Sequence, residues 1–195
     1  MTLYGFGTTT TGLCIDIGHS YTGIRRFLFH ACMAPRTYPK VLAVTPVIDG
    51  LVQDMAKTTI ALAGQSIHRY FAQLLAANAL PHDEAFVTYL IETSGAVEIS
   101  QDPGRAHAAL PKTIEVQYND TPLTVGEFRT TIADVLFDPE LIDSSSISLI
   151  DAIATSVQHC PPETRPILMN NLALTGGCAH LKGLPCFLSS LSWDG

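Results

Sequence analysis

The sequence predicts an α/β or α+β fold, and two observations support that prediction. Short apolar runs that end in turn residues indicate strands, and longer stretches whose apolar residues recur every three or four positions indicate helices. The two kinds of segment mix along the whole chain. No unit of about 20–50 residues repeats, so a solenoid or a propeller is excluded.

Two predicted strands end in loops that could bind a ligand. The run Gly12–Ile17 brings Asp16 to a glycine turn at Gly18, and residues 172–174 lead into Thr175, Gly176 and Gly177. A further pair of strands, over residues 114–118 and 123–125, flanks the turn residues Asn119 and Asp120.

Three helices are predicted. The helical pattern begins at Asp54 and closes at Pro81, and Asp83 is the expected N-cap of the next helix. Ser144 to Ser146 offer caps for the third helix, which runs to Pro161. The apolar stripe of the first helix consists of Ile67, Tyr70, Phe71, Leu74 and Leu75.

Composition limits the classes of function. The chain has 195 residues, of which 47% are apolar and 15% charged, and this composition is typical of a folded protein. Its net charge is −7 and it contains no run of Lys or Arg, so we expect no direct nucleic-acid partner. No apolar stretch is long enough to span a bilayer, so no membrane partner is expected. Five scattered cysteines do not indicate a disulfide framework or a zinc site.

The two strand-end loops contain residues suited to binding a nucleotide. A carboxylate such as Asp16 can hold a metal-bound water, and neighbouring glycine and hydroxyl residues let backbone N–H groups approach phosphate oxygens. Paired glycines at Gly176 and Gly177 allow a flat ring or a sugar to lie against the backbone. Each loop alone is more typical of an ordinary turn than of a ligand site. We expect both loops to face one cleft.

Several segments, taken in order, resemble the actin family. The Leu-Tyr pair at positions 3–4 is similar to the family's hinge, and residues 10–18 are similar to its second phosphate-binding loop. The other matching segments are Thr45-Pro46-Val47-Ile48-Asp49-Gly50, Leu62-Ala63-Gly64, Asp134-Val135-Leu136-Phe137-Asp138-Pro139 and Asn171-Leu172-Ala173-Leu174-Thr175-Gly176-Gly177.

The resemblance implies part of an actin-like, RNase H-like ATPase fold, namely its second half. This would be a mixed sheet with flanking helices and a small helical subdomain. Residues 1–49 and 101–195 would form the sheet-containing lobe, and residues 50–100 the smaller subdomain. The first phosphate loop and the group that orients the attacking water belong to the first half, so we expect no catalytic residues here.

The resemblance also implies binding of ATP or ADP with magnesium. Asp16 would contact the metal through water, and the family's phosphate and nucleoside contacts fall on Gly18, Ser20, Thr22, Gly64, Glu92, Gly176, Gly177, Cys178 and His180. His19, Gln65 and Ile91 depart from the aspartate, arginine and lysine of the family pattern. Losing a charged contact costs about 1–3 kcal/mol, so we expect weakened or lost binding.

Residues 25–43 form a loop or an insertion relative to actin. Two explanations stay open, a partner-binding insert and an aberrant gene model. The histidines His68, His82, His107 and His159 have no neighbours at metal-ligand spacing, which favours structural or surface roles. Cys14 and Cys178 are expected to be small core residues and not nucleophiles.

Three classes of function follow. The first is an actin-related protein that serves as a non-catalytic nucleotide-binding or scaffold subunit, with other protein subunits as partners. Residues 156–171 are most similar to the nuclear actin-related proteins of SWR-type chromatin remodellers, so a nuclear location is favoured over a cytoplasmic one. The second class is a cytoskeletal actin or a dynactin-type actin-related protein. The third is a sugar or acetate kinase of the same superfamily.

Overall fold

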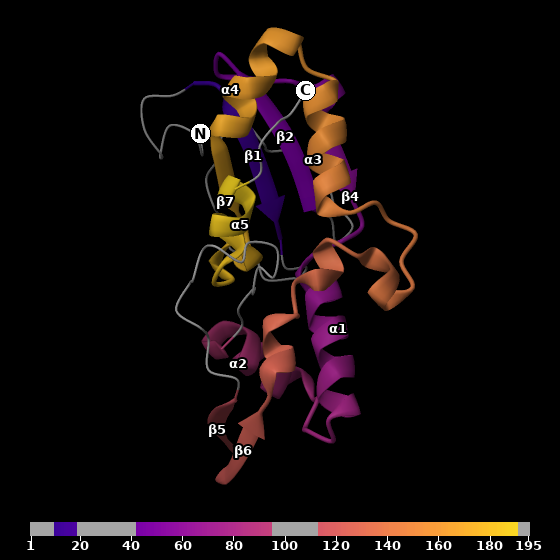
Figure 1. Ribbon diagram of the computed structural model, residues 1–195, viewed down its shortest axis with the longest axis vertical. Helices are drawn as coiled ribbons and strands as arrows, with labels where there is room; N and C mark the ends of the chain where they lie inside the picture. Colours follow the sequence, from indigo (N-terminus) through magenta and orange to yellow (C-terminus); the bar gives the residue numbers. More distant parts are fainter. Residues whose placement is uncertain (1–9, 19–41, 95–112, 191–195) are drawn as a thin grey trace.

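The computed structural model describes residues 10–18, 42–94 and 113–190. The molecule is elongated, with a sheet and its helices at one end (Figure 1). Two helices and a hairpin lie at the other end. We call these regions the sheet end and the helical end. No helix among the described residues is both long and apolar enough to cross a bilayer.

The main sheet is mixed. Its strands are β1 (Gly12–Ile17), β2 (Leu42–Ile48), β3 (Leu51–Val52), β4 (Thr58–Ile60) and β7 (Leu172–Thr175). The order is β3-β2-β1-β7, with β4 also paired to β2. The strands β1 and β7 run parallel, whereas β2 is antiparallel to β1, β3 and β4. The predicted mixed α/β fold is therefore confirmed.

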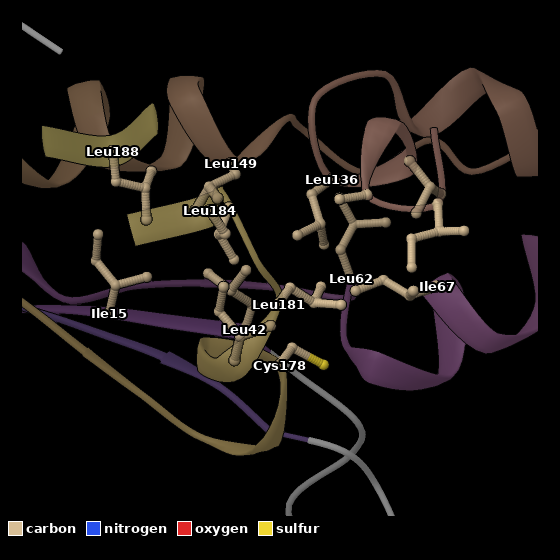
Figure 2. Close-up of a cluster of buried hydrophobic side chains, with 14 of the residues drawn as sticks. Ile15, Leu42, Leu62, Ile67, Leu136, Leu149, Cys178, Leu181, Leu184 and Leu188 are labelled. Carbon is tan, nitrogen blue, oxygen red and sulfur yellow. The ribbon is translucent and has the colours of Figure 1, made fainter. Parts of the chain in front are cut away.

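One apolar cluster joins the sheet to the helices. Alternate residues of β1 point into it, because Leu13, Ile15 and Ile17 are fully buried while the Asp16 side chain between the last two is exposed. Figure 2 shows a part of this cluster, where β1 and β2 contribute to the same core as residues from the C-terminal segment. The labelled members are Ile15, Leu42, Leu62, Ile67, Leu136, Leu149, Cys178, Leu181, Leu184 and Leu188.

Helices surround this core. The α-helices are α1 (Gly64–Ala77), α2 (Glu84–Ser94), α3 (Leu149–Gln158), α4 (Arg165–Asn170) and α5 (Leu184–Ser190). The 3₁₀ turns are η2 (Asp54–Ala56), η3 (Glu127–Thr130), η4 (Asp134–Leu136), η5 (Pro139–Ile142), η6 (Pro162–Thr164) and η7 (Gly177–His180). The predicted stripe of α1 is confirmed: Ile67, Phe71 and Leu75 are buried.

The first helix is shorter than the sequence predicted. It begins at Gly64 and not at Asp54, because residues 58–60 form β4 and pair with β2 through Leu42 and Ile60. It ends at Ala77, four residues before Pro81. Asn78 caps the helix by donating its side-chain N–H to the Leu74 carbonyl, 2.8 Å away.

Of the two predicted helix caps, one is confirmed and one is wrong. Asp83 accepts a hydrogen bond from the Phe86 N–H at 3.1 Å, as expected for the cap of α2. The third helix begins later than Ser144–Ser146 predicted. Its cap is Ser148, whose hydroxyl accepts from the Asp151 N–H at 3.1 Å.

The predicted hairpin is confirmed as β5 (Ile114–Tyr118) and β6 (Thr121–Val125). Asn119 and Asp120 both have positive φ, 49° and 59°, which suits a tight two-residue turn. The hairpin contacts α2, where the Phe86 and Tyr118 rings lie 4.4 Å apart.

Two predicted boundaries differ from the structure. Leu42 and Ala43 belong to β2 and pair with Ile17 and Asp16, so the expected loop over 25–43 cannot extend past residue 41. The rest of that loop lies outside the described residues. The strands β3 and β4, residues 51–52 and 58–60, also belong to the main sheet, whereas the sequence assigned residues 50–100 to the smaller subdomain. The division into lobes is otherwise a prediction.

Candidate functional site

The two predicted loops meet at one edge of the sheet. The parallel register of β1 and β7 pairs Asp16 with Thr175, so the carboxyl ends of both strands lie side by side. Gly176 has φ +93°, and a Cβ built there would lie 2.3 Å from the Ile17 carbonyl oxygen and 2.8 Å from Asp16 Oδ1. Only glycine fits this close approach, which is to the chain's own Ile17 and Asp16. That a ring or a sugar lies against these glycines stays a prediction.

Asp16 lies at the carboxyl end of β1, and its side chain is exposed. The surrounding protein removes part of its hydration, and this desolvation raises the pKa of the carboxyl above 3.8, while the positive charge of Lys57 partly offsets the rise. The next loop residue described, Gly18, accepts a hydrogen bond at its carbonyl from the Gly64 N–H, 3.0 Å away. This bond ties the first loop to the start of α1.

A cavity of about 430 Å³ lies beside these loops, between α1, α2 and η7. Five of the residues predicted from the resemblance line it, and they come from three separate segments of the chain: Gly64, Glu92, Gly177, Cys178 and His180. Its volume is in the range of small-molecule sites. The fold thus gathers predicted residues that the sequence separates widely.

The other predicted residues are arranged differently. Asp16, Gly18 and Gly176 lie at the adjoining sheet edge and do not line the cavity. Ser20 and Thr22 lie outside the described residues. Among the described residues, no group of three His, Cys, Asp or Glu side chains could hold a metal ion.

Sequence reasoning missed five residues of the cavity wall. Three are apolar, Ile67, Ile91 and Leu181, and two are polar, His68 and Thr88. The His68 Nε2 atom lies 3.2 Å from the Thr88 Oγ1 atom, so a hydrogen bond joins α1 to α2 at the cavity. His68 lies four positions after Gly64, and residues four apart on a helix lie on the same face. This spacing was the signal in the sequence that could have placed His68 in the cavity wall.

Cys178 is buried at the base of the site and belongs to the apolar cluster (Figure 2). Burial raises the pKa of its thiol to about 11. The thiol is therefore protonated at neutral pH and is not an activated nucleophile. The structure agrees with the expected role of a small core residue.

Gln65, which departs from the family's arginine, does not line this cavity. It lines a second, more polar cavity of about 590 Å³ on α1, together with Arg69 and Ser144. Among the described residues, no Lys or Arg side chain lines the first cavity, and Glu92 is the carboxylate in its wall. This apolar lining with one acidic side chain suits an uncharged flat group with hydroxyls better than an anion.

Comparisons with known proteins point to one family. The chain is 43% identical over 72 residues to the actin-like protein ARP6 of Yarrowia lipolytica, covering 37% of this chain and 18% of that protein. It is 28% identical to actin-related protein 2 of Arabidopsis thaliana over 192 residues, 95% of this chain and 44% of the relative. It is 23% identical to actin-related protein 7 of Oryza sativa subsp. indica over 94% of this chain and 46% of the relative. The chain spans less than half the length of each. No family model matches the chain.

Proposed function

We propose that this chain, which belongs to the actin-related proteins, is a nucleotide-binding or scaffold subunit of a multiprotein complex and does not itself hydrolyse ATP. The observation that carries the proposal is the cavity between α1, α2 and η7. Residues that the family resemblance assigns to the nucleoside, among them Gly64, Glu92 and Gly177, line it together. Such convergence is expected of a binding site.

The cavity fits the nucleoside part of ATP or ADP. The carboxylate of Glu92 can accept hydrogen bonds from ribose hydroxyls, and the apolar side chain of Ile91 offers a surface for a base. The glycine backbone at Gly177 lets the ligand approach closely. A bound magnesium ion would neutralise phosphate charge near Asp16, whose carboxylate would hold it through water.

A scaffold role is supported by the charge of this site. In the family pattern a lysine and an arginine stand where Ile91 and Gln65 stand here, and no Lys or Arg of the part of the chain that the structure describes lines the cavity. Phosphoryl transfer depends on positioned charge around the phosphates. We therefore expect binding to be weak and turnover to be absent.

The subclass we propose is the nuclear one, with the subunits of a chromatin remodeller as partners. The supporting segment, residues 156–171, contains a turn held by two side-chain hydrogen bonds. Arg165 donates from Nε to the Cys160 carbonyl at 3.0 Å and from Nη2 to the Gln158 carbonyl at 2.9 Å. These bonds fix the Pro-Glu turn between α3 and α4 that carries the resemblance.

A cytoskeletal role is the second candidate, favoured by the similarity to actin-related protein 2, which extends over nearly the whole chain. Sedimentation under polymerising salt separates the two. We expect the chain to stay in the supernatant and to co-purify with a remodelling ATPase from nuclear extract. Ordered filaments in the pellet would favour the cytoskeletal role. The superfamily kinase alternative has no specific observation in its favour.

Calorimetry with Mg-ATP tests nucleotide binding directly. We expect a dissociation constant between about tens of micromolar and millimolar, because among the described residues no Lys or Arg lines the cavity to balance phosphate charge. Phosphate release should not exceed the buffer rate, with full-length actin as the positive control. Submicromolar affinity, or turnover above the buffer rate, would contradict the proposal.

A further inference from the structure

The cavity wall contains a hydrogen-bonded pair whose geometry suggests a more specific role. Thr88 on α2 and His68 on α1 both line the cavity, with 3.2 Å between the Oγ1 and Nε2 atoms. Around them the wall is apolar, formed by Ile67, Ile91 and Leu181. A polar group at one fixed position in an apolar cavity determines how a ligand is oriented.

The Thr88 hydroxyl differs from that of another threonine on the same helix. Thr93 donates its hydroxyl to the Tyr89 carbonyl at 2.6 Å, a bond within one helical turn. Thr88 instead bonds the neighbouring helix through His68. A hydroxyl has one donor and two acceptor positions, so the bond to His68 holds it in place and still leaves it able to contact a ligand.

Thr88 and Glu92 place two polar groups on the same wall of the cavity. The two residues are four positions apart on α2, so their side chains share one face and are separated by about 6 Å along the helix axis. Both line the cavity. If Glu92 contacts ribose hydroxyls, Thr88 lies one helical turn away on the same wall, where a second part of the same nucleoside can reach it.

We propose that the Thr88 hydroxyl contacts the amino-bearing edge of an adenine base, and that His68 is the positioning residue that orients this hydroxyl. The proposal rests on the proposed nucleotide-binding function and names its specificity contact. The flat faces of the base lie against the apolar wall. Phosphate groups play no part in this contact.

The test compares adenosine with purine riboside, which lacks the 6-amino group, in NMR titrations of the full chain. The native chain should bind adenosine about five- to tenfold more tightly, as expected for one buried hydrogen bond. Thr88→Val keeps the shape of the side chain but lacks the hydroxyl, and should remove this preference. Thr88→Ser should retain it, and His68→Ala should reduce it.

Thr93→Val is the matched control. The native Thr93 hydroxyl bonds within α2, and Thr93 does not line the cavity, so this substitution should leave the preference for adenosine over purine riboside unchanged. Urea unfolding of each variant shows whether it folds. An unchanged preference in Thr88→Val, with both nucleosides still bound, would overturn this inference alone. Failure of the native chain to bind either nucleoside would overturn both the inference and the proposed nucleotide binding.

Discussion

The sheet end and the helical end of the molecule hold their shape by different means. At the sheet end, strand pairing fixes the backbone, and the β1–β7 register places Asp16 beside Thr175. At the helical end, contacts between side chains hold the elements together. The rings of Phe71 and Phe128 lie 6.2 Å apart, and the Tyr118 hydroxyl of the hairpin donates to Asp83 at the start of α2. The cavity lies where the two ends meet. The sheet end contributes the loop with Gly177, and the helical end contributes the hydrogen-bonded pair His68 and Thr88.

This difference indicates which features of the site can vary. A loop at the end of two paired strands cannot shift without breaking backbone hydrogen bonds, so Gly176 has a fixed environment. On α2 the cavity residues Thr88 and Glu92 can change while the helix keeps its packing, since its buried core residue Phe86 does not line the cavity. On α1 the buried core residue Ile67 also lines the cavity, so a change there affects both. The departures at Gln65 and Ile91 both fall on these helices.

The largest effect should come from the core that joins the ends. Ile15 at the sheet end and Phe71 at the helical end belong to one buried cluster. Ile15→Ala should cost about 2–5 kcal/mol and Phe71→Ala about 3–5 kcal/mol of unfolding free energy. Urea unfolding followed by circular dichroism and by tyrosine fluorescence should give one shared transition in each. Two separate transitions would show that the two ends fold independently.

The next largest effect should come from the glycine at the sheet edge. Gly176→Ala places a Cβ against the Ile17 carbonyl at a positive φ, so it should destabilise the chain by about 2–4 kcal/mol. Gly18→Ala is the matched control, because nothing lies within 4 Å of a Cβ there. Chemical denaturation measures both. Equal effects of the two substitutions would show that the close approach does not constrain the loop.

A smaller effect should come from the cap of α3, which covers the sheet end. Ser148→Ala removes the hydroxyl that accepts from the Asp151 N–H, and should cost about 1 kcal/mol. Ser145→Ala should have no measurable effect, because Ser145 lies outside the helix. Thermal unfolding of the two variants provides the measurement. A larger loss in Ser145→Ala would restore the cap that the sequence predicted.

The smallest effect should be a pH dependence at the helical end. The Tyr118 hydroxyl donates to Asp83 Oδ1 at 2.8 Å, and this bond, with the Phe86 N–H, lowers the pKa of Asp83 below 3.8. A carboxyl whose pKa is lower in the folded state stabilises it above the unfolded value, and that contribution is lost as the pH falls through the folded value. Tyr118→Phe should therefore weaken the dependence of the urea midpoint between pH 6 and pH 3. An identical pH profile would show that this bond contributes nothing in solution.

Much of the local structure could be predicted from the sequence. The alternation along β1, the Asn119-Asp120 turn and the Asp83 cap each depend on residues close together in the chain, so a local pattern identifies them. The prediction failed at the start of α1. Residues 58–60 pair with Leu42–Val44, and this distant partner, with no counterpart in the local pattern, makes them a strand.

The sequence by itself determined the resemblance to the actin family, the mixed α/β class and the residue types of both loops, because each depends on the order of short motifs. The reason that position 176 needs a glycine, the close approach of Ile17 and Asp16, is seen only in the fold. Only the tertiary structure brought the sequence-assigned residues Gly64, Glu92 and Gly177 into one cavity wall and paired His68 with Thr88. The physical reason is that a hydrogen bond between two helices depends on how they pack, and packing is set by the whole apolar core.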